Sequence, residues 1–94
     1  MRSYEILPSL LKSLKKLVKK DKPLYEQTMK KIGEIINSTD IEHYKNLRYD
    51  LKELKRVHIG NHVLTFEYNK KEDKILFKDF DHHDNIYKKS QSFL

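Results

Sequence analysis

The hydrophobic positions in the first part of the chain follow a helical period. Residues 10–18 place apolar side chains at the i, i+3, i+4 spacing of an amphipathic helix, with lysines on the opposite face. A second apolar set with the same period runs through residues 24–36. It follows Pro23, which suits a first helical turn because its missing N–H needs no partner there. The connection between these two predicted helices is so short that they are expected to form a helical hairpin.

The middle of the chain shows strand-like alternation around Gly60-Asn61, a pair suited to the positive φ angles of a tight hairpin turn. A turn at this point pairs Ile59 with His62, Val57 with Leu64, and Lys55 with Phe66. Because side chains alternate along a strand, these six share one mostly apolar face. The opposite face is more polar and carries Arg56, His58, Val63, Thr65 and Glu67.

The remaining segments complete an α+β pattern. Ser3–Leu7 is predicted to form a short strand, Asp40–Tyr44 one helical turn, and Lys74–Phe80 a third strand after the hairpin. Residues 81–88 are predicted to form an extended tail. We therefore predict one domain over residues 1–94, with a helical hairpin packed on a small, mainly antiparallel, twisted sheet in two layers.

Composition narrows the class of protein. Of the 94 residues, 37% are hydrophobic and 11% aromatic, which favours a folded domain over a disordered chain. The absence of cysteine excludes disulfides and thiolate metal sites. No apolar run approaches the roughly 20 residues that span a bilayer, and the N-terminus lacks the apolar core of a signal peptide. We expect a cytoplasmic protein with no membrane association.

The charge of +6 and pI of about 9.4 indicate a polyanionic partner: nucleic acid, an anionic membrane surface or an acidic protein. A lysine-rich genome would produce part of this surplus without any partner. The lysines of the first predicted helix fit a membrane surface or an acidic partner. A solvated outer face is the simpler interpretation of them.

Basic and aromatic residues form one candidate site, made of Lys45, Arg48, Lys52, Arg56, His58, His83 and Tyr87. Cations neutralise phosphates, and aromatic rings stack on unpaired bases. RNA cleavage without a metal needs a base for the ribose 2′-OH, cations for the charged phosphorane, and an acid for the leaving 5′-oxygen. Histidine suits both proton transfers. On composition alone, a solvated basic edge is the simpler interpretation.

A metal site is the second candidate, in the stretch Asp79, Asp81, His82, His83 and Asp84. On an extended segment, adjacent His82 and His83 would point to opposite sides and could not share an ion. We therefore predict neither a metal site nor a cofactor.

The order of three motifs resembles the RelE/ParE toxin superfamily of type II toxin–antitoxin modules. The motifs are residues 43–48 (HYKNLR), 55–60 (KRVHIG) and 81–87 (DHHDNIY), and the resemblance covers nearly the whole chain. The tail is similar to the RelE and YafQ branches, in which a His or Arg precedes a Tyr or Phe by four residues. That pair is His83 and Tyr87 here. The resemblance implies the RelE-like microbial RNase fold.

The resemblance also implies an activity: a metal-independent messenger RNA endonuclease that cuts in the ribosomal A site by attack of the 2′-OH. Its implied partners are the ribosome, messenger RNA and a RelB-like amphipathic antitoxin. His83 and His58 would transfer protons, while Arg56 and Lys45 would hold phosphate and Tyr87 would position the nucleotide. Arg48 and Lys52 are expected to bind RNA.

One position departs from RelE. Val63 stands on the middle strand where RelE has an arginine, although the YafQ branch also has an aliphatic residue there. This departure leaves room for a non-catalytic module that binds nucleic acid or the ribosome. A ParE-like toxin that inhibits DNA gyrase is a further alternative, although a binding protein would not need His58, His83 and Tyr87.

Overall fold

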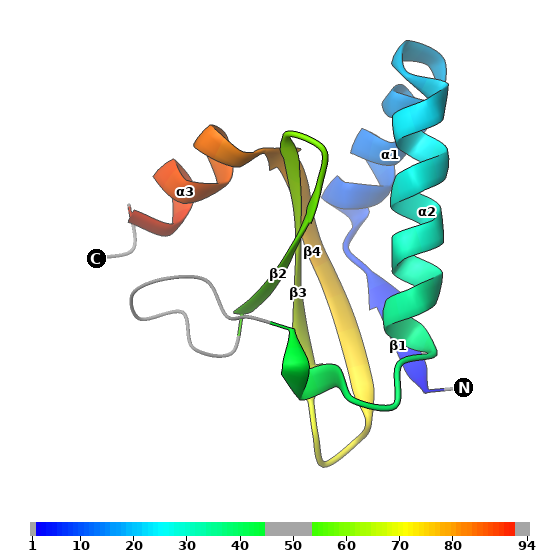
Figure 1. The fold of residues 1–94 in the computed structure, drawn as a ribbon, viewed down its shortest axis with the longest axis vertical. Helices are drawn as coiled ribbons and strands as arrows, with labels where there is room; N and C mark the ends of the chain where they lie inside the picture. Colours follow the sequence, from blue (N-terminus) through cyan, green and yellow to red (C-terminus); the bar gives the residue numbers. More distant parts are fainter. Residues whose placement is uncertain (1, 45–53, 92–94) are drawn as a thin grey trace.

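A computed structural model describes residues 2–44 and 54–91, without the side chains of residues 87 and 89–91. A twisted sheet of four strands carries a helical hairpin on one face and a short helix on the other (Figure 1). In chain order the elements are β1 (Ser3–Ile6), α1 (Pro8–Lys20), α2 (Lys22–Ile36), the 3₁₀ turn η1 (Ile41–His43), β2 (Leu54–Ile59), β3 (His62–Asn69), β4 (Lys74–His82) and α3 (His83–Gln91). The predicted α+β class is confirmed.

The strand order is β1-β4-β3-β2, in which β1 runs parallel to β4 and the other pairs are antiparallel. The predicted hairpin register is confirmed, since Ile59 pairs with His62 and Val57 with Leu64. Gly60 has φ +61°, the left-handed conformation that a tight turn requires and that glycine adopts without strain. The turn thereby fixes which face each β2 side chain occupies.

The main core lies between the helical hairpin and the sheet. Leu10 of α1 and Ile35 of α2 pack with Phe66 of β3 and Phe77 of β4, and none of these four is more than 1% exposed. The two phenylalanine rings lie 5.9 Å apart. Full burial of each such side chain contributes roughly 1.5–3 kcal/mol. No helix in the described ranges is long and apolar enough to cross a membrane.

A single residue, Asp21, separates α1 from α2 and confirms the tight helical hairpin. Its backbone N–H donates to Leu17 O at 2.8 Å, which closes α1. Its carboxylate accepts a hydrogen bond from Leu24 N at 3.2 Å and so caps the N-terminus of α2.

The prediction of an extended tail over residues 81–88 is wrong beyond His82. The chain turns at His83 into α3, which lies on the face of the sheet opposite α1 and α2 (Figure 1). Ile86 of α3 is 3% exposed and packs with Val63, which is fully buried, and with Leu54. Burial of Ile86 on the sheet provides the tertiary contact that a short polar helix needs. The sheet is therefore covered on a second face, which the two-layer prediction lacked.

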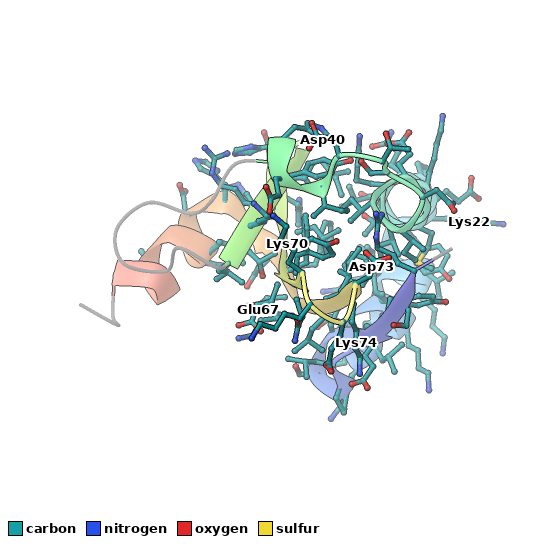
Figure 2. The ribbon with its side chains drawn as sticks, turned by 90° about the horizontal axis from the view of Figure 1, so that it is seen from below. Lys22, Asp40, Glu67, Lys70, Asp73 and Lys74 are labelled. Carbon is teal, nitrogen blue, oxygen red and sulfur yellow. The ribbon has the colours of Figure 1, made fainter. Side chains whose placement is uncertain are left out.

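Arg2 joins three parts of the fold. Its Nη1 donates to Ile36 O at 2.9 Å at the end of α2, and its Nε donates to Asp73 Oδ1 at 2.9 Å. Asp73 lies in the β3–β4 turn (Figure 2). The guanidinium also lies 5.7 Å from the centre of the Tyr68 ring. The Arg2 side chain is only 13% exposed, so its bond to Ile36 O is partly buried, whereas Asp73 is 55% exposed.

Replacing Arg2 by methionine is expected to lower the free energy of unfolding by about 2 kcal/mol, since hydrogen bonds to charged groups contribute roughly 1.5–3 kcal/mol. Urea denaturation measures the loss. Lys12→Met on the exposed face of α1 is the matched control and should leave the stability nearly unchanged. Equal stabilities for the two variants would contradict the role assigned to Arg2.

Candidate active site

The polar face of the β2–β3 hairpin carries Arg56 and His58 side by side. They are two residues apart on β2 and share the face that α3 partly covers, while Val57 between them packs against the main core. Arg56 Nη1 lies 3.3 Å from Nδ1 of His58. A guanidinium only donates hydrogen bonds, so Nδ1 is the acceptor. We therefore assign the ring proton of neutral His58 to Nε2.

The surroundings of His58 favour its neutral form. Partial burial is the largest cause that lowers its pKa below 6.5, followed by the positive charge of Arg56 and then by His83. The imidazole is therefore largely uncharged at pH 7. In this form it can donate from Nε2 without adding a charge to the site.

An NMR titration is expected to place the midpoint of the His58 ring below 6.5. Arg56→Gln should raise this midpoint, because the variant removes a repelling charge, but burial should keep it below the ordinary value. The folded state disfavours the imidazolium, so the His58 contribution to stability is present above pH 6.5 and falls as the pH drops toward the folded-state pKa. A wild-type midpoint above 6.5 would contradict the proposed surroundings.

His83 reaches the same region from the last part of the chain. It is the first residue of α3, and its backbone N–H donates to Asn61 O in the hairpin turn at 2.9 Å. Its charge is also the third and smallest cause that lowers the pKa of His58. Nε2 of His83 lies 3.1 Å from Oδ1 of Asp84, and the side chain is 46% exposed. The ring is therefore accessible to a ligand.

Of the predicted site residues, the structure brings Arg56 and His58 together on β2 and places His83 at the start of α3, beside the hairpin turn. Tyr87 follows His83 by four residues within α3, the spacing of one helical turn, and its side chain lies outside the described part. The other three candidates also lie outside the described residues; they are Lys45, Arg48 and Lys52.

Val63 has a packing role that the sequence did not reveal. It lies on the same face as Arg56 and His58, yet it is fully buried beneath Ile86. A cation at this position would have to displace α3 or be buried without water. Among the described residues Arg56 is the arginine on this face, and its Nε is buried without an acceptor there.

The prediction that His82 and His83 point to opposite sides is wrong because the chain enters α3 between them. Their ring centroids are 5.0 Å apart. With Asp84 they offer three ligand atoms that lie within 4.8 Å of one another.

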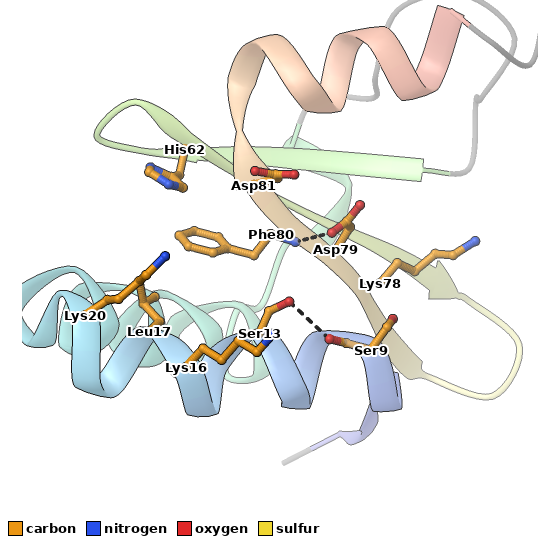
Figure 3. Close-up of a pocket in the computed structure, with 10 residues that line it drawn as sticks. All are labelled: Ser9, Ser13, Lys16, Leu17, Lys20, His62, Lys78, Asp79, Phe80 and Asp81. Carbon is orange, nitrogen blue, oxygen red and sulfur yellow. Dashed lines mark hydrogen bonds between the residues drawn. The ribbon is translucent and has the colours of Figure 1, made fainter.

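A groove of about 530 Å³ lies between α1 and β4 on the other face of the sheet (Figure 3). It is lined by Ser9, Ser13, Lys16, Leu17, Lys20, His62, Lys78, Asp79, Phe80 and Asp81. The His62 ring stacks on Phe80 with centroids 5.0 Å apart. The sequence pattern singled out the α1 lysines but not this groove, which forms only when β4 packs beside α1. We call it the α1–β4 groove.

Comparison with known proteins identifies the family. No protein-family model matches the chain. The RelE4 protein of Methanocaldococcus jannaschii is 48% identical over 94 residues, which cover 99% of this chain and 98% of that protein. The chain belongs to the RelE toxin family. A protein of Methanosarcina mazei is also similar, at 38% identity over 93% of this chain and all of its own length.

Solved RelE-family structures share the fold of this toxin. The isolated E. coli RelE toxin has a TM-score of 0.69 at 17% identity, with both chains fully covered. YafQ from E. coli has a TM-score of 0.63 at 15% identity over 93% of this chain and 99% of its own. The toxin in the RelB–RelE complex of Methanococcus jannaschii has a TM-score of 0.65 at 23% identity, over 88% and 94% of the two chains. The resemblance inferred from the motifs is confirmed.

Proposed function

We propose that this RelE-family toxin is a ribosome-dependent endonuclease that cuts messenger RNA in the A site. The observation that carries the proposal is the contact of Arg56 with His58 on the α3 face of the sheet, together with the accessible His83 next to the turn of the same hairpin. Arg56 and His58 come from β2, and His83 comes from the start of α3. A cation beside two imidazoles provides the groups that transesterification of RNA requires.

In the proposed reaction the 2′-oxygen attacks the adjacent phosphorus. The O2′–P bond forms and the P–O5′ bond breaks, which leaves a 2′,3′-cyclic phosphate and a free 5′-hydroxyl. A base takes the proton from O2′, and an acid gives a proton to O5′. Neither a metal ion nor a small-molecule cofactor takes part in these steps.

Each described site residue has a role that follows from its surroundings. The guanidinium of Arg56 binds the non-bridging phosphate oxygens and stabilises the charge of the phosphorane. His83 is the proton-transfer residue, because its ring is accessible at the start of α3. His58, held neutral with its proton on Nε2, is its partner and donates to the phosphate or the leaving oxygen.

The remaining candidates would bind the message around this centre. We assign nucleotide positioning to Tyr87, one helical turn after His83, and phosphate binding to Lys45. Arg48 and Lys52 would contact the RNA backbone. The ribosome would hold the codon against these groups in the cytoplasm, where translation occurs.

We also assign the toxin a RelB-like, amphipathic and acidic antitoxin. RelB is the antitoxin in the RelB–RelE complex from Methanococcus jannaschii. The charge of +6 supports an acidic partner. So does the α1–β4 groove, which Lys16 and Lys20 of α1 line together with the apolar Leu17 and Phe80 (Figure 3).

A pair of assays tests the proposed class. The purified toxin is added to a translating extract, in which message integrity is followed by primer extension, and to DNA gyrase, in which supercoiling is followed on gels. Cleavage within codons without an effect on supercoiling supports the endonuclease. Inhibition of supercoiling with intact message would assign the protein to the ParE type, and salt-sensitive RNA binding without either effect would make it a non-catalytic module.

A further inference from the structure

The junction between β4 and α3 gathers three side chains that suit a divalent metal. Nδ1 of His82 lies 3.7 Å from Oδ2 of Asp84, and Nε2 of His83 lies 3.1 Å from Oδ1 of the same carboxylate. One ligand atom from each residue fits within 4.8 Å of the others. The carboxylate thus lies between two imidazoles, and all three residues are accessible from solvent.

We propose that His82, His83 and Asp84 bind Zn²⁺ through one imidazole nitrogen from each histidine and one carboxylate oxygen. Two imidazoles and a carboxylate form a donor set typical of zinc, and water would complete the coordination. Zinc–nitrogen bonds of about 2.0–2.1 Å place neighbouring tetrahedral ligands about 3.3 Å apart. The side chains are 42%, 46% and 67% exposed, so small rotations can close the cluster around the ion.

The hydrogen bonds around the cluster favour this arrangement. Nδ1 of His82 accepts the backbone N–H of Asp84 at 3.3 Å, so the ring is already oriented toward the start of α3, and a zinc ion at Nδ1 would replace this hydrogen bond. Asp81 accepts hydrogen bonds from His82 N at 2.7 Å and from Asn85 Nδ2 at 3.1 Å. Its carboxylate adds a second negative charge beside the site and offsets the positive end of the α3 dipole.

Zinc binding would control the proposed nuclease. A lone pair of His83 that coordinates zinc cannot accept a proton from the RNA. Occupation of the cluster therefore inhibits cleavage and acts as a metal-dependent switch on the active site. This consequence depends on the proposed function, whereas zinc binding itself does not.

Isothermal titration of tag-free toxin with Zn²⁺ tests the site directly. We expect one ion per chain. His82→Gln and Asp84→Asn should each weaken binding at least about 10-fold, as loss of a metal-site interaction does. His43→Gln changes a histidine in η1, away from the cluster, and should bind like the wild type. Co²⁺ titration gives a second readout, since tetrahedral coordination produces visible absorption that His82→Gln should lose.

Cleavage assays on ribosomes complete the test. Zinc should inhibit the wild type but not His82→Gln, which should retain the zinc-free rate. Equal zinc affinity in the wild type and His82→Gln, or absence of stoichiometric binding, would overturn the metal site and leave the nuclease intact. Stoichiometric binding by a protein that cuts no RNA in zinc-free buffer would uphold the metal site and contradict the proposed function.

Discussion

Replacing His83 by alanine is expected to lower the rate of RNA cleavage by about 10²–10⁴-fold, the usual contribution of a positioned proton-transfer group. The imidazole at the start of α3 is accessible and lies next to the turn of the hairpin that carries His58. Alanine suits a helix, so α3 and the buried Ile86 should remain in place. Single-turnover cleavage on programmed ribosomes measures the change.

His82→Gln is the matched control for this variant. His82 is the preceding residue, and its side chain is 42% exposed against 46% for His83. Circular dichroism should show both variants folded, and only His83→Ala should lose cleavage. If His83→Ala cuts at the wild-type rate, His83 does not transfer the proton.

Arg56→Ala should reduce cleavage by about 10²–10³-fold, the cost of removing one donor that stabilises transition-state charge. We expect this large effect because the α3 face has Val63, buried under Ile86, at the position where a second cation could have stood. In the proposed mechanism Arg56 therefore stabilises the phosphorane without an arginine on the middle strand. Arg56→Lys should recover only part of the rate, because an ammonium lacks the planar fork that matches phosphate.

Lys12→Ala is the charge-matched control for Arg56→Ala. It removes one positive charge from the exposed face of α1, on the other side of the sheet. The control should cut RNA at the wild-type rate. Equal losses in the two variants would mean that the net charge of the toxin, rather than phosphate binding by Arg56, controls the reaction.

Local chemistry explains why the hairpin could be predicted. Gly60-Asn61 specifies a tight turn, and a tight turn fixes the register of both strands. Because side chains alternate along β2, this register is enough to place Arg56 and His58 on one face of the sheet. The helical hairpin follows in the same way from its apolar period and from Pro23.

The position of His83 could not be predicted from local patterns. Residues 83–91 form a short and mostly polar segment. This segment folds as α3 because Ile86 packs against Val63 on the sheet. Such a contact between distant segments leaves no periodic signal in either of them. The same turn into α3 brings His82 and His83 together, which an extended tail would have excluded. The resemblance to RelE and YafQ singled out His83 as a site residue without explaining its placement.

The measurement that tests the central claim most directly is cleavage of a message on ribosomes stalled with a known codon in the A site. We predict that the toxin cuts within that codon and leaves a 2′,3′-cyclic phosphate, while the same RNA without ribosomes stays intact. The cut should disappear with His83→Ala and persist with His82→Gln. An uncut A-site codon at saturating toxin, or cleavage by both variants alike, would contradict the proposed function.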